Sequence, residues 1–349
     1  MMLSVLTDYG FRESEFNAEP FGTGLINNTW KITAADKVYI LQRINNAVFK
    51  DPQDIANNIR LMADYLSEHH PEYLFVTPIR SADGDDMVLK EGEGFFRLFP
   101  FIRGSHTIDV VQKPEQAHEA AVQFGRFTRS LSGIAIEKFK TTVPGFHDLA
   151  LRHRQFSDVL KNGNKERILE SKEVIKALIA NAEIVSVYEK IKTDQAFRLR
   201  VTHHDTKVSN VLFDENAKGL CVIDLDTAMP GFFISDVGDM MRTYLSPVSE
   251  EERDMDKIAV RGDFYKAVVQ GYMEEMKEEL SKAEKDYFFY AGRFMIYMQA
   301  LRFLTDYLSD DIYYGEKYPG HNLMRARNQL TLLTRLAEKE DTLTGRTVT

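Results

Sequence analysis

The sequence has 349 residues, of which 44% are hydrophobic and 28% are charged, a composition typical of a globular protein rather than a disordered chain. This length suggests two domains or one two-lobed unit. The formal net charge of −9 argues against nucleic acid as the main partner, and the single cysteine, Cys221, excludes an internal disulfide or a thiolate metal cluster. We therefore expect a protein of a reducing compartment.

The N-terminus and the apolar segments give no sign of membrane association. The first eleven residues lack a basic region, and Thr7 and Asp8 interrupt their apolar stretch, so they do not resemble a signal peptide. The most apolar later stretch, 287–304, contains Arg293 and Arg302 and is therefore expected to form a buried helix rather than a membrane span. We expect a cytoplasmic protein that needs neither a membrane nor a protein partner.

The first hundred residues predict a β-rich region. Residues 20–33 combine glycines with β-branched and aromatic residues, and together with the run VYILQRI at 38–44 they predict a β-hairpin. A helix is expected at 51–66, because a proline suits its first position and apolar residues then recur at helical spacing. Two further apolar runs, 75–80 and 95–102, predict strands.

The pattern changes after Gly104, where helical periodicity becomes dominant. Helices are expected at 115–131, 172–190, 263–278, 285–308 and 323–337. A short β-like segment lies between the second and the third of them. The sequence therefore predicts an α+β fold of two lobes, with a small β-rich N-lobe at 1–102 and a large, mainly helical C-lobe at 103–349.

The β-like segment carries polar residues of the kinds that phosphate chemistry requires. Asp205 and Asn210 come just before one strand. Asp224 and Asp226 follow the return strand, so a hairpin would bring all four side chains together. Their oxygens suit magnesium, which takes one or two carboxylates together with substrate phosphates. Phosphoryl transfer also needs a carboxylate for the proton of the attacking hydroxyl and a nearby cation, which Lys207 would provide.

Any one of these residues could simply make a turn, whereas the complete series is far more specific. T-H-x-D-T-K-x-x-N followed by I-D-L-D-T-x-M-P-G resembles the catalytic loop and metal-binding strand of the protein-kinase-like superfamily, in its aminoglycoside phosphotransferase and choline kinase branch. With the later R-F-L-x-D-Y-L-x-x-D-I-Y and K-Y-P-x-H-N-L, the chain is similar to bacterial N-acetylhexosamine 1-kinases, which phosphorylate the anomeric hydroxyl of GlcNAc or GalNAc. The resemblance implies an ATP- and Mg²⁺-dependent kinase of a small-molecule sugar acceptor.

The resemblance implies a role for each matching residue of the β-like segment. Asp205 would be the catalytic base and would contact the acceptor. Lys207 would lie over the transferred phosphoryl group. Asn210 and Asp224 would bind the metal ion, and Asp226 would either bind a second ion or stand behind the ligands of the first.

Other residues would support or complete this site. His203 would brace the catalytic loop by packing, and Asp236 would anchor that loop from the next helix. Towards the C-terminus, Arg302 and Tyr313 would contact the sugar, through a rigid donor fork and a hydroxyl group. The alternative for Arg302, Asp306 and Asp310, which are spaced four residues apart, is a charged helix face exposed to solvent.

The N-terminal region would bind the nucleotide. A glycine-containing segment at 22–29 lies between the first two expected strands, where kinases cover the nucleotide phosphates, and a plain hairpin turn is the alternative. Nucleotide contacts are expected at Gly22, Gly24, Asn27, Thr29, Gln42, Phe99 and Phe101. The two phenylalanines belong to a connector between the lobes, whose backbone would hydrogen-bond adenine.

Gln42 departs from the kinase pattern, in which a lysine on the third strand pairs with a helix glutamate. The helix offers Asn57 and Asn58 in place of that glutamate, so a neutral Gln–Asn pair would replace the ion pair. Lys207 would then be the main protein cation near the γ-phosphate, and Arg43 would point to the opposite face of the strand. Two other hypotheses stay open: a kinase of choline, an aminoglycoside or another sugar, and a non-catalytic nucleotide-binding pseudokinase.

Overall fold

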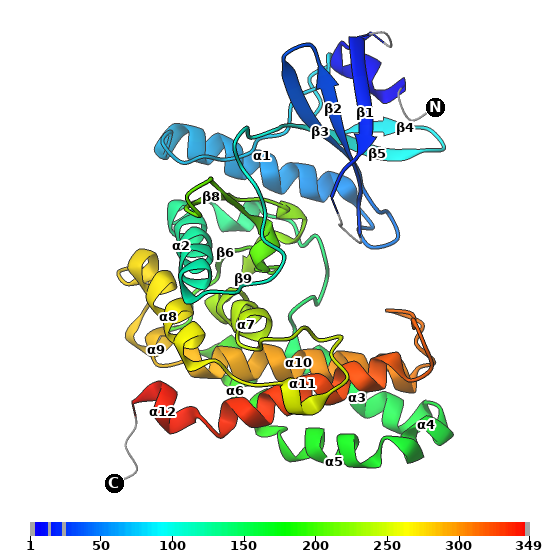
Figure 1. Ribbon diagram of the computed structural model, residues 1–349, viewed down its shortest axis with the longest axis vertical. Coiled ribbons are helices and arrows are strands. Elements are labelled where there is room, and N and C mark those ends of the chain that lie inside the picture. Colours follow the sequence, from blue (N-terminus) through cyan, green and yellow to red (C-terminus); the bar gives the residue numbers. More distant parts are fainter. Residues whose placement is uncertain (1–3, 13–14, 23–25, 346–349) are drawn as a thin grey trace. The chain divides into compact units, whose positions relative to one another are not determined.

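The computed structural model describes residues 4–12, 15–22 and 26–345 (Figure 1). The chain divides into two compact units, each assembled from separate segments. The first, here called the sheet unit, contains Met1–Thr107, Ser130–Pro144 and Val211–Pro230. The second, here called the helical unit, contains Ile108–Arg129, Gly145–Asn210 and Gly231–Thr349.

The sheet unit contains a five-stranded antiparallel sheet in the order β1-β2-β3-β5-β4 (Figure 1). Its strands are β1 (Phe16–Pro20), β2 (Asn28–Ala34), β3 (Lys37–Arg43), β4 (Val88–Lys90) and β5 (Gly94–Pro100). The predicted hairpin is confirmed as β2 and β3, and β5 covers most of the run at 95–102. The strand predicted at 75–80 is wrong, because this run makes only an isolated bridge from Ile79 to Leu98 and contains a proline, which cannot donate to a ladder.

One face of this sheet packs against an apolar core. The short 3₁₀ helix η1 (Ser4–Tyr9) packs there, and the buried cluster consists of Val5, Leu6, Ile32, Leu41, Phe96 and Leu98. Side chains alternate between the two faces of a strand, so the neighbours Gln42 and Arg97 point away from this core. The register pairs these two residues directly across β3 and β5. The opposite face of the sheet therefore carries a polar row.

Further segments of the sheet unit lie outside the five-stranded sheet. Helix α1 (Pro52–His69) begins as predicted, with the Asp51 carboxylate accepting from the N–H of Gln53, and it contacts the 3₁₀ helix η5 (Leu225–Thr227). The predicted hairpin of the β-like segment is confirmed as β7 (Val211–Phe213) and β8 (Gly219–Val222), in which Val211 pairs with Val222. A further 3₁₀ helix, η3 (Ile136–Lys138), belongs to the same unit.

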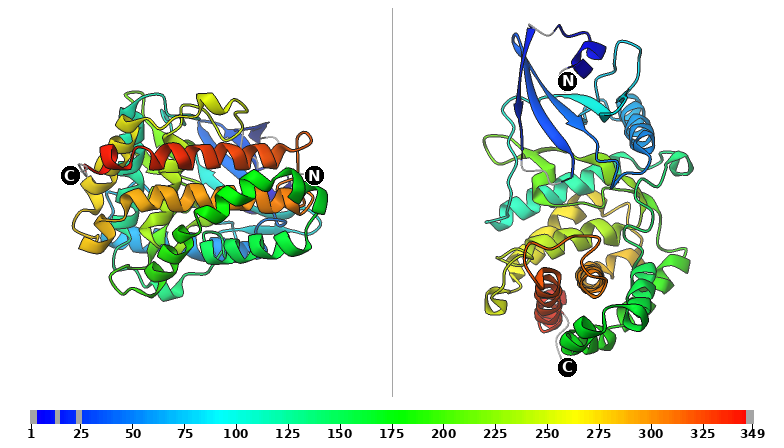
Figure 2. Two further views of the ribbon diagram at one scale, coloured as in Figure 1. Left: turned by 90° about the horizontal axis from the view of Figure 1, so that it is seen from below. Right: turned by 90° about the vertical axis from the view of Figure 1, so that its right-hand side faces the viewer.

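The helical unit is organised around α10 (Phe288–Leu308), in which most side chains are buried. It packs against α3, α7 and α11, and Figure 2 shows α10 and α11 side by side. The other helices are α2 (Pro114–Ser130), α3 (Leu149–Asn162), α4 (Lys165–Glu170), α5 (Lys172–Ala180), α6 (Glu183–Thr193), α7 (Phe233–Tyr244), α8 (Gly262–Met276), α9 (Lys282–Lys285), α11 (His321–Ala337) and α12 (Glu340–Thr344). Short elements near the candidate site are β6 (Arg200–Thr202), η4 (Val208–Asn210), β9 (Met229–Gly231) and η6 (Met255–Lys257).

The α+β fold predicted from the sequence is confirmed, with one helix divided. The helix expected at 172–190 is two helices, α5 and α6, because the chain turns at Asn181, whose side chain hydrogen-bonds the carbonyl of Ala177 and so competes with helical bonding. Over the described residues, no helix combines the length and the apolar character that crossing a bilayer requires.

Candidate active site

The loop from His203 to Asn210 is held by a buried carboxylate on α7. Asp236 Oδ2 accepts from the N–H of His203 at 3.0 Å, and Oδ1 accepts from the N–H of His204 at 2.8 Å. Two consecutive N–H groups can meet one carboxylate here because His204 has a left-handed backbone, with φ of 65°. Burial raises the pKa of Asp236 to about 6, although the N–H of His203 opposes the shift. The predicted anchoring role of Asp236 is confirmed.

His203 also has the predicted supporting role. The His203 ring is fully buried and meets Phe124 and Phe127 edge-on, at centroid distances of 5.1 and 6.0 Å. Its Nδ1 accepts from the N–H of Asp205 at 3.3 Å. Packing and this local hydrogen bond together fix the backbone immediately before the expected catalytic base.

A second carboxylate on α7 holds the middle of the loop, and sequence analysis missed it. Asp239 accepts from the N–H of Thr206 at 2.8 Å, and Tyr244 donates its hydroxyl to the carbonyl of Thr206 at 2.6 Å. Asp239 forms an ion pair with Arg242, at 2.9 Å, which in turn pairs with Glu250 at 2.6 Å. The available signal was the spacing of Asp236 and Asp239, three residues apart and so on one helix face.

The loop brings Asp205, Lys207 and Asn210 together, as predicted. Lys207 Nζ lies 3.0 Å from Asp205 Oδ1, and Asn210 Nδ2 donates to the carbonyl and to Oδ2 of Asp205 at 2.8 and 3.1 Å. Burial is the largest single influence on Asp205 and acts to raise its pKa, but the charge and hydrogen bond of Lys207, together with the charges of His203 and Arg242, outweigh it and the net shift is downward. The same contact raises the pKa of Lys207. At neutral pH Asp205 is therefore an ionised base beside the cation of Lys207. The amide oxygen of Asn210 is turned away from Asp205, because the amide nitrogen donates to that residue.

On the sheet unit, a row of polar side chains crosses β2, β3 and β5. Gln42 Nε2 donates to Thr29 Oγ1 at 3.4 Å, and Gln42 Oε1 accepts from Nε and Nη2 of Arg97 at 3.0 and 2.8 Å. The predicted Gln–Asn pair is therefore wrong for the residues that the structure describes. Asn58 instead donates to the carbonyls of Lys140 and Ala228.

The two aspartates of I-D-L-D occupy different environments. Asp226 is 2% exposed, pairs with Arg97 (Oδ1 to Nη1, 2.5 Å) and accepts from Asn27 Nδ2 at 2.7 Å. Asp224 is exposed and has a left-handed backbone, with φ of 61°. Non-glycine residues in this conformation are strained and concentrate at functional sites, which makes Asp224 the better candidate for contact with a ligand.

The remaining expected nucleotide contacts have mixed outcomes. Gly22 has φ of 79°, which suits glycine, and Gly24 lies outside the described residues. Phe99 lies under the Arg97 guanidinium, 5.0 Å from carbon to ring centroid. The N–H of Phe101 donates to the carbonyl of Val38 at 3.0 Å, so this one donor is already used within the sheet unit. The contact of the connector's backbone with adenine stays a prediction.

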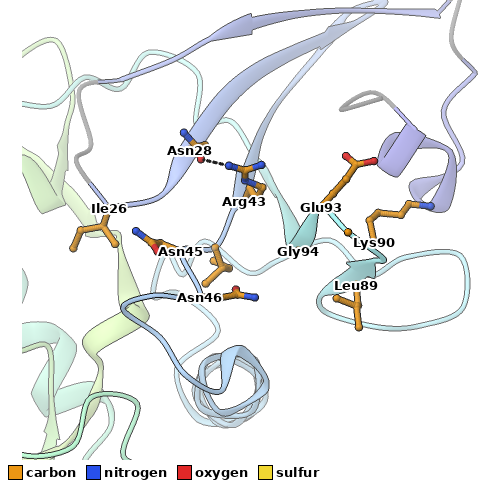
Figure 3. Close-up of a pocket in the computed structure, with 11 residues that line it drawn as sticks. Ile26, Asn28, Arg43, Asn45, Asn46, Leu89, Lys90, Glu93 and Gly94 are labelled. Atoms are coloured by element: carbon orange, nitrogen blue, oxygen red, sulfur yellow. Dashed lines mark hydrogen bonds between the residues drawn. The ribbon is translucent and has the colours of Figure 1, made fainter.

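A hollow of about 590 Å³ on the sheet unit lies beside β3, β4 and β5 (Figure 3). Arg43 lines it and donates to Asn28 Oδ1 at 2.9 Å, with Ile26 and Lys90 also in the lining. The preceding residue, Gln42, is not part of this lining. The prediction that Gln42 and Arg43 use opposite faces of the strand is confirmed.

The expected acceptor residues Arg302 and Tyr313 lie together in the helical unit. The Arg302 guanidinium carbon is 5.9 Å from the centroid of the Tyr313 ring and 5.5 Å from those of Tyr314 and Phe146. Asp306, 5% exposed, accepts from the N–H groups of Tyr313 and Tyr314 at 2.7 and 2.9 Å. The alternative of a solvated charged face is therefore wrong for Asp306, which fixes the loop that carries the tyrosines.

The donor set can be tested against a magnesium ion. Among the described residues, no three His, Cys, Asp or Glu side chains gather as a metal cluster. Magnesium needs no such cluster, because one or two protein oxygens suffice when phosphates and water supply the rest. The exposed carboxylate of Asp224 and the amide oxygen of Asn210 fit that requirement. Asp226 does not fit it, because a guanidinium and an amide already occupy its oxygens.

Comparison with known proteins decides the family. Residues 17–272 match the model of the family described as "Phosphotransferase enzyme family". The chain belongs to this family. The superfamily resemblance found in the sequence is thus confirmed at the level of the phosphotransferase family.

Solved structures of the same fold include three kinases of different small molecules. The chain is similar to a microcompartment-associated aminopropanol kinase (15% identity, TM-score 0.65, 98% of this chain and 97% of the other). It is also similar to amicoumacin kinase in complex with AMP-PNP, Ca²⁺ and Ami (16%, 0.64, 96% and 93%) and to choline kinase from Cryptosporidium parvum Iowa II (15%, 0.59, 99% and 96%). At these identities the likeness establishes the fold and leaves the acceptor open.

Proposed function

We propose that this phosphotransferase transfers the γ-phosphoryl group of ATP to the anomeric hydroxyl of an N-acetylhexosamine, giving the sugar 1-phosphate. The observation that carries the proposal is the loop in which Lys207, Asn210 and the carboxylate of Asp205 converge, held from α7 by Asp236 and Asp239. Catalysis of phosphoryl transfer depends mostly on positioning and charge neutralisation, and a loop braced this closely serves both.

Asp205 is the proposed base. Its lowered pKa keeps it ionised, so it accepts the proton of the acceptor hydroxyl as that oxygen bonds to the γ-phosphorus. The bond from the γ-phosphorus to the β–γ bridging oxygen breaks, and ADP leaves. Lys207 offsets charge on the transferred group. A magnesium ion held by Asn210 and Asp224 would neutralise the phosphate oxygens.

The metal assignment is supported by strand register. Val211 pairs with Val222, and the proposed ligands come one residue before the first and two residues after the second. In a short hairpin with this register, a residue just before the first strand and a residue just after the second lie at the same end of the hairpin. Asn210 and Asp224 therefore remain the proposed pair.

The charges near Arg302 favour a neutral acceptor over choline or an aminoglycoside. Burial, and next the charge of Arg302, lower the pKa of Arg152, so two guanidinium groups influence each other in this part of the helical unit. A cationic acceptor bound beside Arg302 would be repelled by its guanidinium. Arg302 and Tyr313 instead offer donors suited to sugar hydroxyls or an acetamide carbonyl.

The test is an acceptor panel. The protein is incubated with MgATP and, separately, GlcNAc, GalNAc, glucose, galactose, choline and an aminoglycoside, and ADP release and products are measured. We expect acid-labile sugar phosphate from GlcNAc or GalNAc, since anomeric phosphates hydrolyse readily in acid. Turnover on choline with none on the hexosamines would retain the kinase and refute the sugar. ATP binding without turnover on any acceptor would favour the pseudokinase.

A further inference from the structure

The sheet unit holds a buried ion pair that the proposed chemistry does not use directly. Arg97 Nη1 lies 2.5 Å from Asp226 Oδ1, and the two side chains are 1% and 3% exposed. Taking two charges out of water is costly, and only close geometry with additional hydrogen bonds offsets that cost. Those bonds are present, from Arg97 to Gln42 and from Asn27 to Asp226. The pair therefore constrains both β5 and the segment that follows β8.

The pair connects to the glycine-containing segment from two directions. On one side, Asp226 Oδ2 accepts from Asn27, which lies in that segment. On the other, Gln42 accepts from Arg97 and donates to Thr29 near the start of β2. The end of the segment that leads into β2 is thus tied to one guanidinium through a single intermediate residue on each side.

Asp226 is poorly placed to bind a divalent cation. One of its oxygens faces the guanidinium of Arg97 and the other accepts from Asn27, and the positive charge of Arg97 would repel a metal ion at the same carboxylate. Asp224, two residues earlier, is exposed and has a left-handed backbone. The two aspartates of I-D-L-D therefore have different roles. Asp224 is the proposed metal ligand, and Asp226 pairs with Arg97.

We propose that the Arg97–Asp226 pair positions Asn27 and Thr29, at the entry to β2, for the nucleotide phosphates, in place of a lysine on β3 and a glutamate on α1. Asp226 is then a positioning residue, and the protein holds a single divalent ion through Asn210 and Asp224. This inference rests on the proposed function only in assuming that the protein binds a nucleotide. The ion pair itself is present in the structure without one.

The first test needs no nucleotide. Thermal unfolding is measured for Arg97→Met, Asp226→Asn and the double variant, with the partly exposed pair Arg293→Met and Glu183→Gln as the matched control. Each single buried variant leaves a charge unpaired and should lower the midpoint by roughly 5 °C or more, whereas the double variant should lose no more than the worse single one. Losses that simply add would contradict a coupled pair.

The second test counts metal ions. Bound Mn²⁺ is measured by electron paramagnetic resonance at saturating AMP-PNP, and AMP-PNP affinity by calorimetry. We expect one Mn²⁺ in the native protein and in Asp226→Asn, with AMP-PNP affinity about tenfold weaker in that variant and in Arg97→Lys. Arg97→Lys keeps the positive charge, so it still tests the role of Arg97 if Arg97→Met does not fold.

Three outcomes would count against the inference. Two Mn²⁺ ions in the native protein and one in Asp226→Asn would make Asp226 a ligand. Unchanged AMP-PNP affinity in folded Asp226→Asn and Arg97→Lys would remove the positioning role. A native protein that binds no AMP-PNP would refute the proposed function and the nucleotide role together, whereas the unfolding experiment would still decide whether the pair is coupled.

Discussion

Replacing the loop anchor tests whether catalysis depends on how α7 holds the loop. In Asp236→Asn, one oxygen can still accept a backbone N–H, but the new NH₂ group must face the other N–H, from His203 or His204. A lost hydrogen bond to a charged group is worth about 1.5–3 kcal/mol. If that loss appears in the transition state, kcat falls about 10- to 150-fold, since each 1.36 kcal/mol is a factor of ten.

The assay is steady-state ADP release at saturating MgATP and acceptor, with AMP-PNP affinity measured in parallel. We expect the kcat loss with AMP-PNP affinity within about twofold of native, because Asp236 lies in the helical unit and holds the loop rather than the nucleotide segment. Asp158→Asn, an exposed aspartate of the same unit, is the matched control and should leave kcat unchanged. A kcat for Asp236→Asn within twofold of native, in a folded protein, would refute the reasoning.

The same variant gives a pH dependence whose sign is fixed. Asp236 has a raised pKa of about 6, so as the pH falls through 6 the native carboxyl gains a proton and loses an acceptor, as in the asparagine variant. The native kcat should fall toward that of Asp236→Asn between pH 7 and 5, while the variant stays flat. The contribution of Asp236 to folding stability changes in the opposite direction. It rises as the pH falls below 6, because the folded state binds the proton more tightly than the unfolded state does. A constant ratio of the two kcat values across this range would contradict the assignment.

Three further substitutions test separate contacts. Gly231→Ala would place its Cβ against the side chains of Thr202 and His204, and should destabilise the protein by about 1–3 kcal/mol in chemical denaturation; native-like stability would contradict this close packing. Arg302→Met should raise the acceptor KM about tenfold or more with AMP-PNP affinity unchanged, and an unchanged acceptor KM would remove Arg302 from the acceptor site. Tyr244→Phe removes the hydroxyl bond to the loop and should lower kcat about two- to tenfold, whereas a native kcat would show that this bond does not hold the catalytic geometry.

Local sequence patterns predicted the parts of the fold and site that are themselves local. The catalytic loop is one contiguous series, α1 has the periodicity of one buried helix face, and α10 is apolar over most of its length, so each could be found without knowing the fold. The turn at Asn181 was missed because apolar periodicity continues through it. Helix α3 was missed because its buried positions are few among polar ones.

The polar network of the sheet unit could not be found in this way. Gln42 and Arg97 are 55 residues apart, and Asn27 and Asp226 are 199 apart, so their contacts depend on strand register and on where the segment after β8 packs. Arg97 lies in a run of apolar residues and gives no local signal that it will be paired. The sequence could suggest that Gln42 needs a partner but not which side chain supplies it.

The most direct test of the account is a single-turnover experiment on Asp205→Asn. Native protein and variant are mixed with acceptor and radiolabelled MgATP, and phosphorylated acceptor is separated and counted, with AMP-PNP affinity measured in both. The account predicts that the variant binds AMP-PNP within a few-fold of native and transfers phosphate at least about a hundredfold more slowly, since a general base contributes 10² or more. Transfer at the native rate by Asp205→Asn would contradict the central claim that this carboxylate accepts the proton of the attacking hydroxyl.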